Sequence, residues 1–441
     1  MSPVIPSSSA SSEKRFQIYL DRLAEVLGHA DRHEPLRLYT TGLLLPGERK
    51  SVEPMAARVD PRRVRSRHQS LHHFVAEANW DEASLLAAVR DYVLPALQKQ
   101  GALQAWIVDD TGMPKKGQHS VGVAHQYCGQ LGKQANCQVA VSLSIAHEQS
   151  SLPIAYRLYL PESWIQDKAQ RKTTGVPAEV QFQTKPEIAL EQIRQALAAK
   201  VPRGPVLCDA GYGNHFGFRS ELTTLGLPYI AGIEAHTTVW RAEQAPQTVP
   251  ASHGRGRPFR RLPRDGPHQP VSVKQLALSL PESAWHTVAW REGTKGKLRS
   301  RFARLRVVPA YHTRGSTEEP RPDEWLLVEW PAGEPEPTKY WLSTLPKHWS
   351  VRALVNRAKL RWRVERDYEE LKQELGLSHY EGRGWRGFHH HAALCIAAYG
   401  FLAAERAAFP PSGSTGRPGL SAPRLPKGFQ PRGAARPSGT A

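Results

Sequence analysis

Four acidic residues stand where their carboxylates could hold metal ions. Asp109 and Asp110 end the apolar run AWIVDD, and Asp209 ends a second run, PVLCD. Glu365 lies much later, in the polar stretch RWRVERDYEELK. Acids at the carboxyl ends of buried strands point into the crevice where open α/β sheets bind ligands. Carboxylates from two strands and a helix are hard oxygen ligands of the kind that Mg²⁺ prefers, and two such ions can promote phosphodiester cleavage.

Each of these residues also has an ordinary structural interpretation. A lone Asp at the end of a strand is more often a turn residue or a helix cap. On one helix, Arg361, Glu365, Tyr368 and Lys372 would share a continuous face. That face can be a solvated ladder of ion pairs, or it can present a metal-binding carboxylate flanked by cations that grip phosphates. The order of the motifs, strand acid, strand acid and helix acid, favours the catalytic interpretation.

The apolar patterns predict an α/β fold that is preceded by helices. Helical spacing begins at Phe16, returns over 64–77 and again after Asp81, which we expect to be an N-cap. After Gly101, strand-like runs at 138–146 and 152–160 precede a predicted helix, as expected of a mixed or parallel sheet. The predicted segments are a disordered leader (1–13), a helical DNA-binding domain (14–100), the first part of the α/β core (101–235), a basic β-rich insertion (236–340), the C-terminal helical part of the core (341–410) and a disordered basic tail (411–441).

Charge favours a polyanionic partner. The 441 residues include 59 Lys and Arg against 41 Asp and Glu, a formal charge of +18. Residues 236–310 alone carry 14 Lys and Arg against 4 Asp and Glu, so more than half of the net charge lies in the insertion. Four cysteines in a chain of this length do not make a disulfide scaffold. The N-terminus has no apolar signal core, and we expect a cytoplasmic protein that does not enter a membrane.

The three acidic motifs, in this order, resemble those of DDE transposases of bacterial insertion sequences. Arg361, Glu365 and Lys372 match the branch with a Tyr-x2-Arg-x3-Glu-x6-Lys signature, although Ala358 stands where that signature has Tyr. VDDTG resembles the first-acid strand of the family and selects Asp109, with Asp110 as the alternative. VLCDAGYG resembles the second-acid strand and selects Asp209. The resemblance covers roughly residues 20–408.

The resemblance implies an RNase H-like core whose sheet is interrupted by a β-rich insertion before the Glu-bearing helix. It implies that Asp109, Asp209 and Glu365 hold two Mg²⁺ ions, which Mn²⁺ can replace, and that the enzyme cuts element ends and joins them to target DNA. The partners would be double-stranded DNA and a second copy of the chain, as a homodimer on the DNA. A metal-dependent nuclease that never joins strands, and a catalytically silent DNA-binding relative, are the alternatives.

Basic residues outside the acidic motifs are candidates for DNA contacts. Lys115 and Lys116 follow the first acids and would border the metal crevice, beside Arg361 and Lys372. In the N-terminal domain, helical spacing would bring Arg58, Arg62 and Arg65 to one face; the insertion contributes a basic cluster. Its members are Arg255, Arg257, Arg260, Arg261, Lys295, Lys297, Arg299 and Arg301.

Two further groups could be read as metal ligands. His389, His390 and His391 are consecutive, so a helix would turn them in different directions, and we expect surface or DNA-facing roles, with packing as the alternative for His391. Cys128 and Cys137 lie near His125, but their spacing fits no paired zinc motif, so structural cysteines are favoured.

Overall fold

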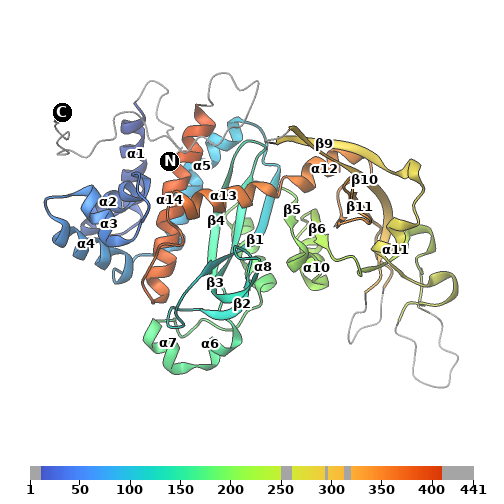
Figure 1. The fold of residues 1–441 in the computed structure, drawn as a ribbon, viewed down its shortest axis with the longest axis horizontal. Coiled ribbons are helices and arrows are strands. Elements are labelled where there is room, and N and C mark those ends of the chain that lie inside the picture. The colour runs from blue at the N-terminus through green and yellow to red at the C-terminus, as the bar shows by residue number, and fades with distance from the viewer. Residues whose placement is uncertain (1–10, 250–260, 294–295, 312–318, 410–441) are drawn as a thin grey trace. The chain divides into compact units, whose positions relative to one another are not determined.

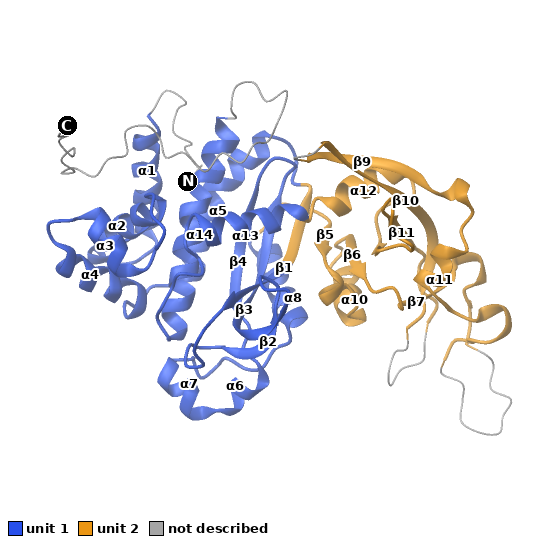
Figure 2. Ribbon diagram, in the orientation of Figure 1, with its two compact units in different colours: residues 1–103, 109–199, 362–441 blue, residues 104–108, 200–361 orange. Residues whose placement is uncertain are grey.

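A computed structural model describes residues 11–249, 261–293, 296–311 and 319–409 (Figure 1). The chain forms two compact units (Figure 2): unit 1 comprises residues 1–103, 109–199 and 362–441, and unit 2 comprises residues 104–108 and 200–361. The predicted tail and residues 1–10 of the predicted leader lie outside the described residues, whereas residues 12 and 13 are already helical. Within the described ranges, no helix is long and apolar enough to cross a membrane.

Unit 1 begins with helices and continues into strands. The N-terminal helices are α1 (Ser12–Glu25), α2 (His33–Leu44), α3 (Val52–Val59), α4 (Val64–Ala76) and α5 (Glu82–Lys99). The remaining elements of unit 1 are the second half of β1 (Ala105–Pro114), β2 (Ala124–Cys128), β3 (Lys133–Ala146), β4 (Ser151–Leu158), α6 (Glu162–Gln166), α7 (Lys168–Thr174), α8 (Lys185–Ala198), α13 (Trp362–Gln373) and α14 (Trp385–Ala408). Strand β3 lies between β2 and β1 and also pairs with β4.

Helix α14 is the central support of unit 1. It packs against α5, β4, α2 and α4, and its apolar residues face all directions because nearly the whole helix is buried. Gly400 permits the close approach of α5, since a Cβ there would lie 2.6 Å from a methyl carbon of Val89. The buried Tyr19 hydroxyl of α1 donates to the Ala397 carbonyl at 2.7 Å. The apolar sequence run from Ala392 to Ala404 is therefore a core helix.

Unit 2 is built on strands, with a few helices. Its elements are the first half of β1, β5 (Val206–Cys208), α9 (Ala210–Gly213), α10 (Phe216–Thr224), β6 (Tyr229–Ile233), β7 (Thr238–Arg241), β8 (Val271–Ser272), α11 (Val273–Leu278), β9 (His286–Gly293), β10 (Gly296–Pro309), β11 (Glu324–Trp330), β12 (Lys339–Ser343) and α12 (Val351–Lys359). The strand order is β1-β5-β6-β12-β11-β10-β7-β8, and β9 also pairs with β10. β1, β5 and β6 are parallel, whereas the strands from β12 to β8 are antiparallel to their neighbours.

The mixed α/β fold class and the helical N-terminal region are as the sequence predicts. Several elements also agree: α4 covers most of 64–77, Asp81 caps α5 through the Ser84 amide at 2.8 Å, and no described strand precedes β1. The prediction that Arg58, Arg62 and Arg65 share one helix face is wrong. Helix α3 ends at Val59 because Pro61 disfavours helical backbone at Asp60, so the three arginines lie on two helices and the turn between them.

Candidate functional site

The two neighbouring acids of β1 have different surroundings. Successive residues of a strand face opposite sides of the sheet. On one side, the Lys185 ammonium donates to Asp110 Oδ2 at 2.8 Å. Lys185 is the first residue of α8, whose start is fixed by a capping box between Thr184 and Glu187. The carboxylate of Asp110 is therefore held by a cation from α8.

Asp109, by contrast, interacts electrostatically with side chains of α13. The Lys372 ammonium donates to the Gly112 carbonyl of β1 at 2.9 Å, which ties α13 to this strand. Burial lowers the pKa of Lys372, and the negative charge of Asp109 is among the opposing influences. The Tyr368 side chain is buried. Burial raises the pKa of its phenol, and Asp109 and Asp110 raise it further. Lys372 and Tyr368 therefore lie within electrostatic reach of Asp109.

Glu365 stands on α13 one turn before Tyr368 and two turns before Lys372, in the first turn of the helix. Its side chain is exposed, whereas Val364, Tyr368 and Leu371 are buried. Helical periodicity places Glu365 on the same face of α13 as Tyr368 and Lys372. Lys372 contacts β1, and the charge of Asp109 acts on both of these side chains. Within unit 1, Asp109 and Glu365 thus belong to one strand–helix pair.

Asp367, also on α13, is a buried carboxyl of a different kind. Its Oδ1 accepts hydrogen bonds from the hydroxyls of Ser151 and Tyr399, both at 2.7 Å. Burial raises its pKa to about 6, against the opposing influence of these two hydrogen bonds. Asp367 therefore anchors α13 to β4 and α14, which leaves Glu365 on the exposed side of the same helix.

Asp209 belongs to unit 2, where it follows β5 and caps the short helix α9. Its Oδ1 accepts a hydrogen bond from the Gly211 amide at 2.9 Å. Two glycines let this turn lie directly on β6: a Cβ on Gly213 would come within 1.9 Å of the Gly232 carbonyl oxygen, and a Cβ on Gly232 would come within 3.2 Å of the Asp209 Cα. The sequence DAGYG thus fixes the backbone at Asp209.

The predicted cationic residues differ in accessibility. Lys115 is largely buried, which lowers its pKa, and its ammonium donates to the Tyr380 carbonyl at 2.9 Å. Lys116 is exposed, as are Arg62 before α4 and Arg299 on β10. The prediction of one continuous helix face that includes Arg361 is wrong. Helix α12 ends at Lys359, α13 begins at Trp362, and Arg361 lies in the intervening turn.

The surface or DNA-facing role expected for His389 and His390 is also wrong, whereas His391 is packed, the alternative given for it. His389, His390 and His391 are 4%, 1% and 1% exposed, respectively. His389 Nε2 accepts from the Leu158 amide at 3.2 Å, and the His390 ring stacks on Trp80 with centroids 3.6 Å apart. Burial lowers the pKa of each imidazole to about 4. These rings are packing residues because α14 is buried on all sides.

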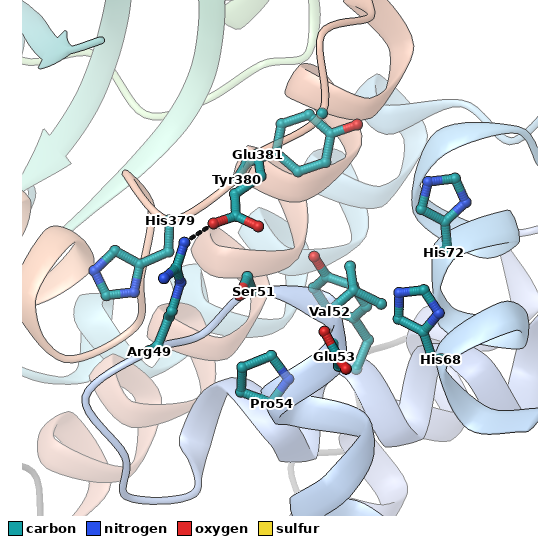
Figure 3. Close-up of a pocket in the computed structure, with 12 residues that line it drawn as sticks. Arg49, Ser51, Val52, Glu53, Pro54, His68, His72, His379, Tyr380 and Glu381 are labelled. Atoms are coloured by element: carbon teal, nitrogen blue, oxygen red, sulfur yellow. Dashed lines mark hydrogen bonds and ion pairs between the residues drawn. The ribbon is translucent and has the colours of Figure 1, made fainter. Parts of the chain in front are cut away.

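A polar cavity of about 470 Å³ lies in unit 1 between the N-terminal helices and the segment after α13 (Figure 3). Its lining includes His68 and His72 of α4, together with Arg49 and Glu381, which form an ion pair. None of the predicted acids lines this cavity.

Over the described part of the chain, no three His, Cys, Asp or Glu side chains form a recognisable metal-binding group. Cys128 and Cys137 are buried free thiols.

Lys185 is a neighbour of the acids that sequence reasoning did not single out, and Tyr368 was named there only as a member of a helix face. Lys185 is 75 residues from Asp110, and its position at the start of a helix resembles that of many surface lysines. Tyr368 is visible in the helical pattern but carries no motif of its own. Only the tertiary fold connects these residues with β1.

Comparison with known families identifies the class of protein. A family model described as DDE superfamily endonuclease matches residues 22–297, more than half of the chain. The chain therefore belongs to the DDE superfamily endonucleases, in agreement with its mixed α/β fold. The matched range includes Asp109 and Asp209 and ends before α13.

A curated relative is the probable transposase for insertion sequence element IS701 of Microchaete diplosiphon. The two chains are 31% identical over 169 residues. This alignment covers 38% of the present chain and 41% of the relative, so the similarity spans about two fifths of each protein.

Proposed function

We propose that this chain is a transposase that binds the ends of its element, cleaves phosphodiester bonds there and joins the 3′ ends to target DNA. The observation that carries the proposal is the strand register. β1 and β5 are parallel, with Ile107 paired to Leu207. In sequence, Asp109 and Asp209 each stand two residues beyond this pair: Asp209 directly follows β5, whereas Asp109 lies inside β1, which continues to Pro114. Family membership and the similarity to a probable transposase support the same activity.

In this proposal, Asp109, Asp209 and Glu365 hold two Mg²⁺ ions, or Mn²⁺ in their place. The donor set fits: all three are carboxylates, Asp109 and Asp209 are half-buried, and Glu365 is exposed. Asp110 fits less well, because its carboxylate already binds Lys185. Divalent ions bound there would supply activation of the attacking hydroxyl and stabilisation of the leaving oxygen.

The remaining residues of the chain bind and orient the DNA. Lys372 has three N–H donors and gives one to Gly112, so it can meet a phosphate oxygen while it holds α13 on β1. Arg361, Lys115, Lys116, Arg62 and Arg299 are the further proposed phosphate contacts. A homodimer on DNA would allow the two ends of an element to be cut within one complex.

The test of this function uses the purified chain, Mg²⁺ and duplexes from the two ends of its own element. Transposition predicts cleavage at the element ends, and joining of precleaved 3′ ends to a supercoiled plasmid, both stopped by EDTA. Cleavage without any joining would instead establish the nuclease. Specific binding without either reaction would establish the catalytically silent DNA-binding protein.

The basic insertion gives a prediction about salt. Arg261, Lys297 and Arg299 are exposed in unit 2, whereas Arg255, Arg257, Arg260 and Lys295 lie outside the described residues. Replacing the three exposed residues with glutamine should flatten the slope of log affinity against log salt by up to about 3, because each phosphate contact releases roughly one counterion. The slope is measured by titrating a non-specific duplex at several salt concentrations.

A matched control removes charge elsewhere in unit 2. Lys200 and Arg203 are exposed and lie outside the insertion. Changing both to glutamine should alter the slope less per charge removed. Equal slopes for the insertion variant and the wild type would remove these three residues from the DNA interface.

A further inference from the structure

The turn between β2 and β3 presents two large apolar side chains to solvent. Tyr127 is 62% exposed and Leu131 is 44% exposed. Tyr127 is the most exposed large apolar residue in the described part of the chain. The two residues lie four positions apart around one turn, so this turn exposes a small apolar surface.

The turn is held rigidly. Tyr127 pairs with Gln134 and Cys128 pairs with Lys133 across the hairpin. The Leu131 amide donates to the Cys128 carbonyl at 2.9 Å, and Gly132 adopts a φ of +62°, which a glycine tolerates without strain. Two exposed side chains on such a turn are presented with little loss of backbone entropy on binding.

The turn end of the hairpin lies against the strand that carries the first acids. Cys128 is fully buried, and a Cβ placed on Gly112 would lie 3.0 Å from its sulfur. Gly112 is also the residue whose carbonyl accepts from Lys372 of α13. The hairpin, β1 and α13 therefore meet at Gly112, three residues after Asp109. All of these residues belong to unit 1.

The surroundings of the turn are cationic. No acidic residue occurs between Asp110 and Glu148, while Lys116 and Lys133 in this stretch are exposed. Glutamines 126, 130 and 134 add uncharged polar groups near the turn. A protein partner would require a larger apolar surface with a polar rim. Duplex DNA offers stacked apolar bases behind an anionic backbone, which matches two apolar side chains flanked by lysines.

We propose that Tyr127 and Leu131 form a wedge that enters duplex DNA beside the cleavage site and unstacks a base step, while Lys116 and Lys133 hold the flanking phosphates. This inference rests on the proposed function, because it requires DNA at Asp109. An inserted apolar side chain separates neighbouring bases and kinks the duplex, and the Tyr ring can stack on an exposed base. The contact at Gly112 would fix the distortion relative to the acids.

The experiment uses an element-end duplex with 2-aminopurine at successive positions around the cleavage site. Binding of the full chain in Ca²⁺ should raise the fluorescence at one step, because the probe brightens when it is unstacked. The variant with Tyr127→Ser and Leu131→Ser should lose most of this rise. It should also cleave the paired duplex about tenfold more slowly, because it no longer assists unstacking. Phe182→Ser, at a residue that is 39% exposed elsewhere in unit 1, is the matched control.

A second duplex carries a mismatch at the base step where the fluorescence rises. It distinguishes a wedge from a merely structural role of Tyr127 and Leu131. The mismatch removes part of the cost of unstacking, so it should restore cleavage by the double variant towards the wild-type rate. An unchanged fluorescence rise in the double variant, or a wild type that binds without any rise, would overturn the wedge while the proposed cleavage activity stood. Failure of the mismatch to restore cleavage would also contradict it. Absence of cleavage by the wild type on any duplex would count against the proposed function instead.

Discussion

Glu365→Gln should reduce DNA cleavage by at least about a thousandfold, because a metal ligand contributes several kcal/mol to stabilising the transition state. Asp109→Asn and Asp209→Asn should have the same effect. DNA binding should stay within a few fold of wild type, since none of the three carboxylates binds a phosphate directly. Cleavage of an end duplex in Mg²⁺ and binding in Ca²⁺, measured on the same preparations, give the two quantities.

The same helix and strand supply matched controls. Glu369 is exposed one turn after Glu365, so Glu369→Gln removes an equivalent charge from α13 and should leave cleavage nearly unchanged. Asp110→Asn breaks the pair with Lys185 and should retain measurable cleavage. If Asp110→Asn abolishes cleavage and Asp109→Asn does not, the proposed first ligand on β1 is the wrong residue. Near-normal cleavage by Glu365→Gln would contradict the metal-site proposal.

The strands beside the acids were predictable because their signal is local: the buried runs AWIV and VLC identify β1 and β5. Asp209 directly follows β5 as predicted, whereas the prediction that Asp109 and Asp110 end their strand is wrong, because β1 continues to Pro114. Asp81 was equally predictable as a cap, since capping depends on residues three positions apart. The resemblance supplied what periodicity could not, namely the choice of Asp109 over Asp110 and of Glu365 among the many acids of α13. Those choices stay predictions.

The errors over Arg361 and the consecutive histidines come from tertiary contacts that leave no local pattern. The sequence from 351 to 373 has no proline and reads as one helix, yet it breaks at Leu360 and Arg361. Lys359, the last residue of α12, is held in unit 2 by Glu329, whereas Lys372 fixes α13 to β1 in unit 1. Two sets of contacts in two units therefore override helix propensity. The consecutive histidines were misjudged for the same reason, because α14 is covered on every side.

Removing one member of the pair that fixes the end of α12 should strongly destabilise the protein. The Lys359 ammonium lies 2.7 Å and 2.6 Å from the two carboxylate oxygens of Glu329, and the two side chains are only 15% and 5% exposed, respectively. It also lies 4.3 Å from the centroid of the Trp290 ring. Burial lowers the pKa of Lys359, and Glu329 opposes that shift. Glu329 thus compensates a cation that would otherwise be unfavourable in this position.

Glu329→Ala should lower the free energy of unfolding by about 3–5 kcal/mol, because it leaves the Lys359 charge buried and unpaired. Urea unfolding followed by tryptophan fluorescence measures the change. The double variant Glu329→Leu with Lys359→Met should recover most of the loss, since an apolar pair of similar volume needs no desolvation of charge. Glu336→Ala, which breaks the exposed pair with Lys274, is the control and should cost about 0–1 kcal/mol. A loss below about 1 kcal/mol for Glu329→Ala, or a double variant no more stable than the single one, would show that desolvation of Lys359 does not govern this pair.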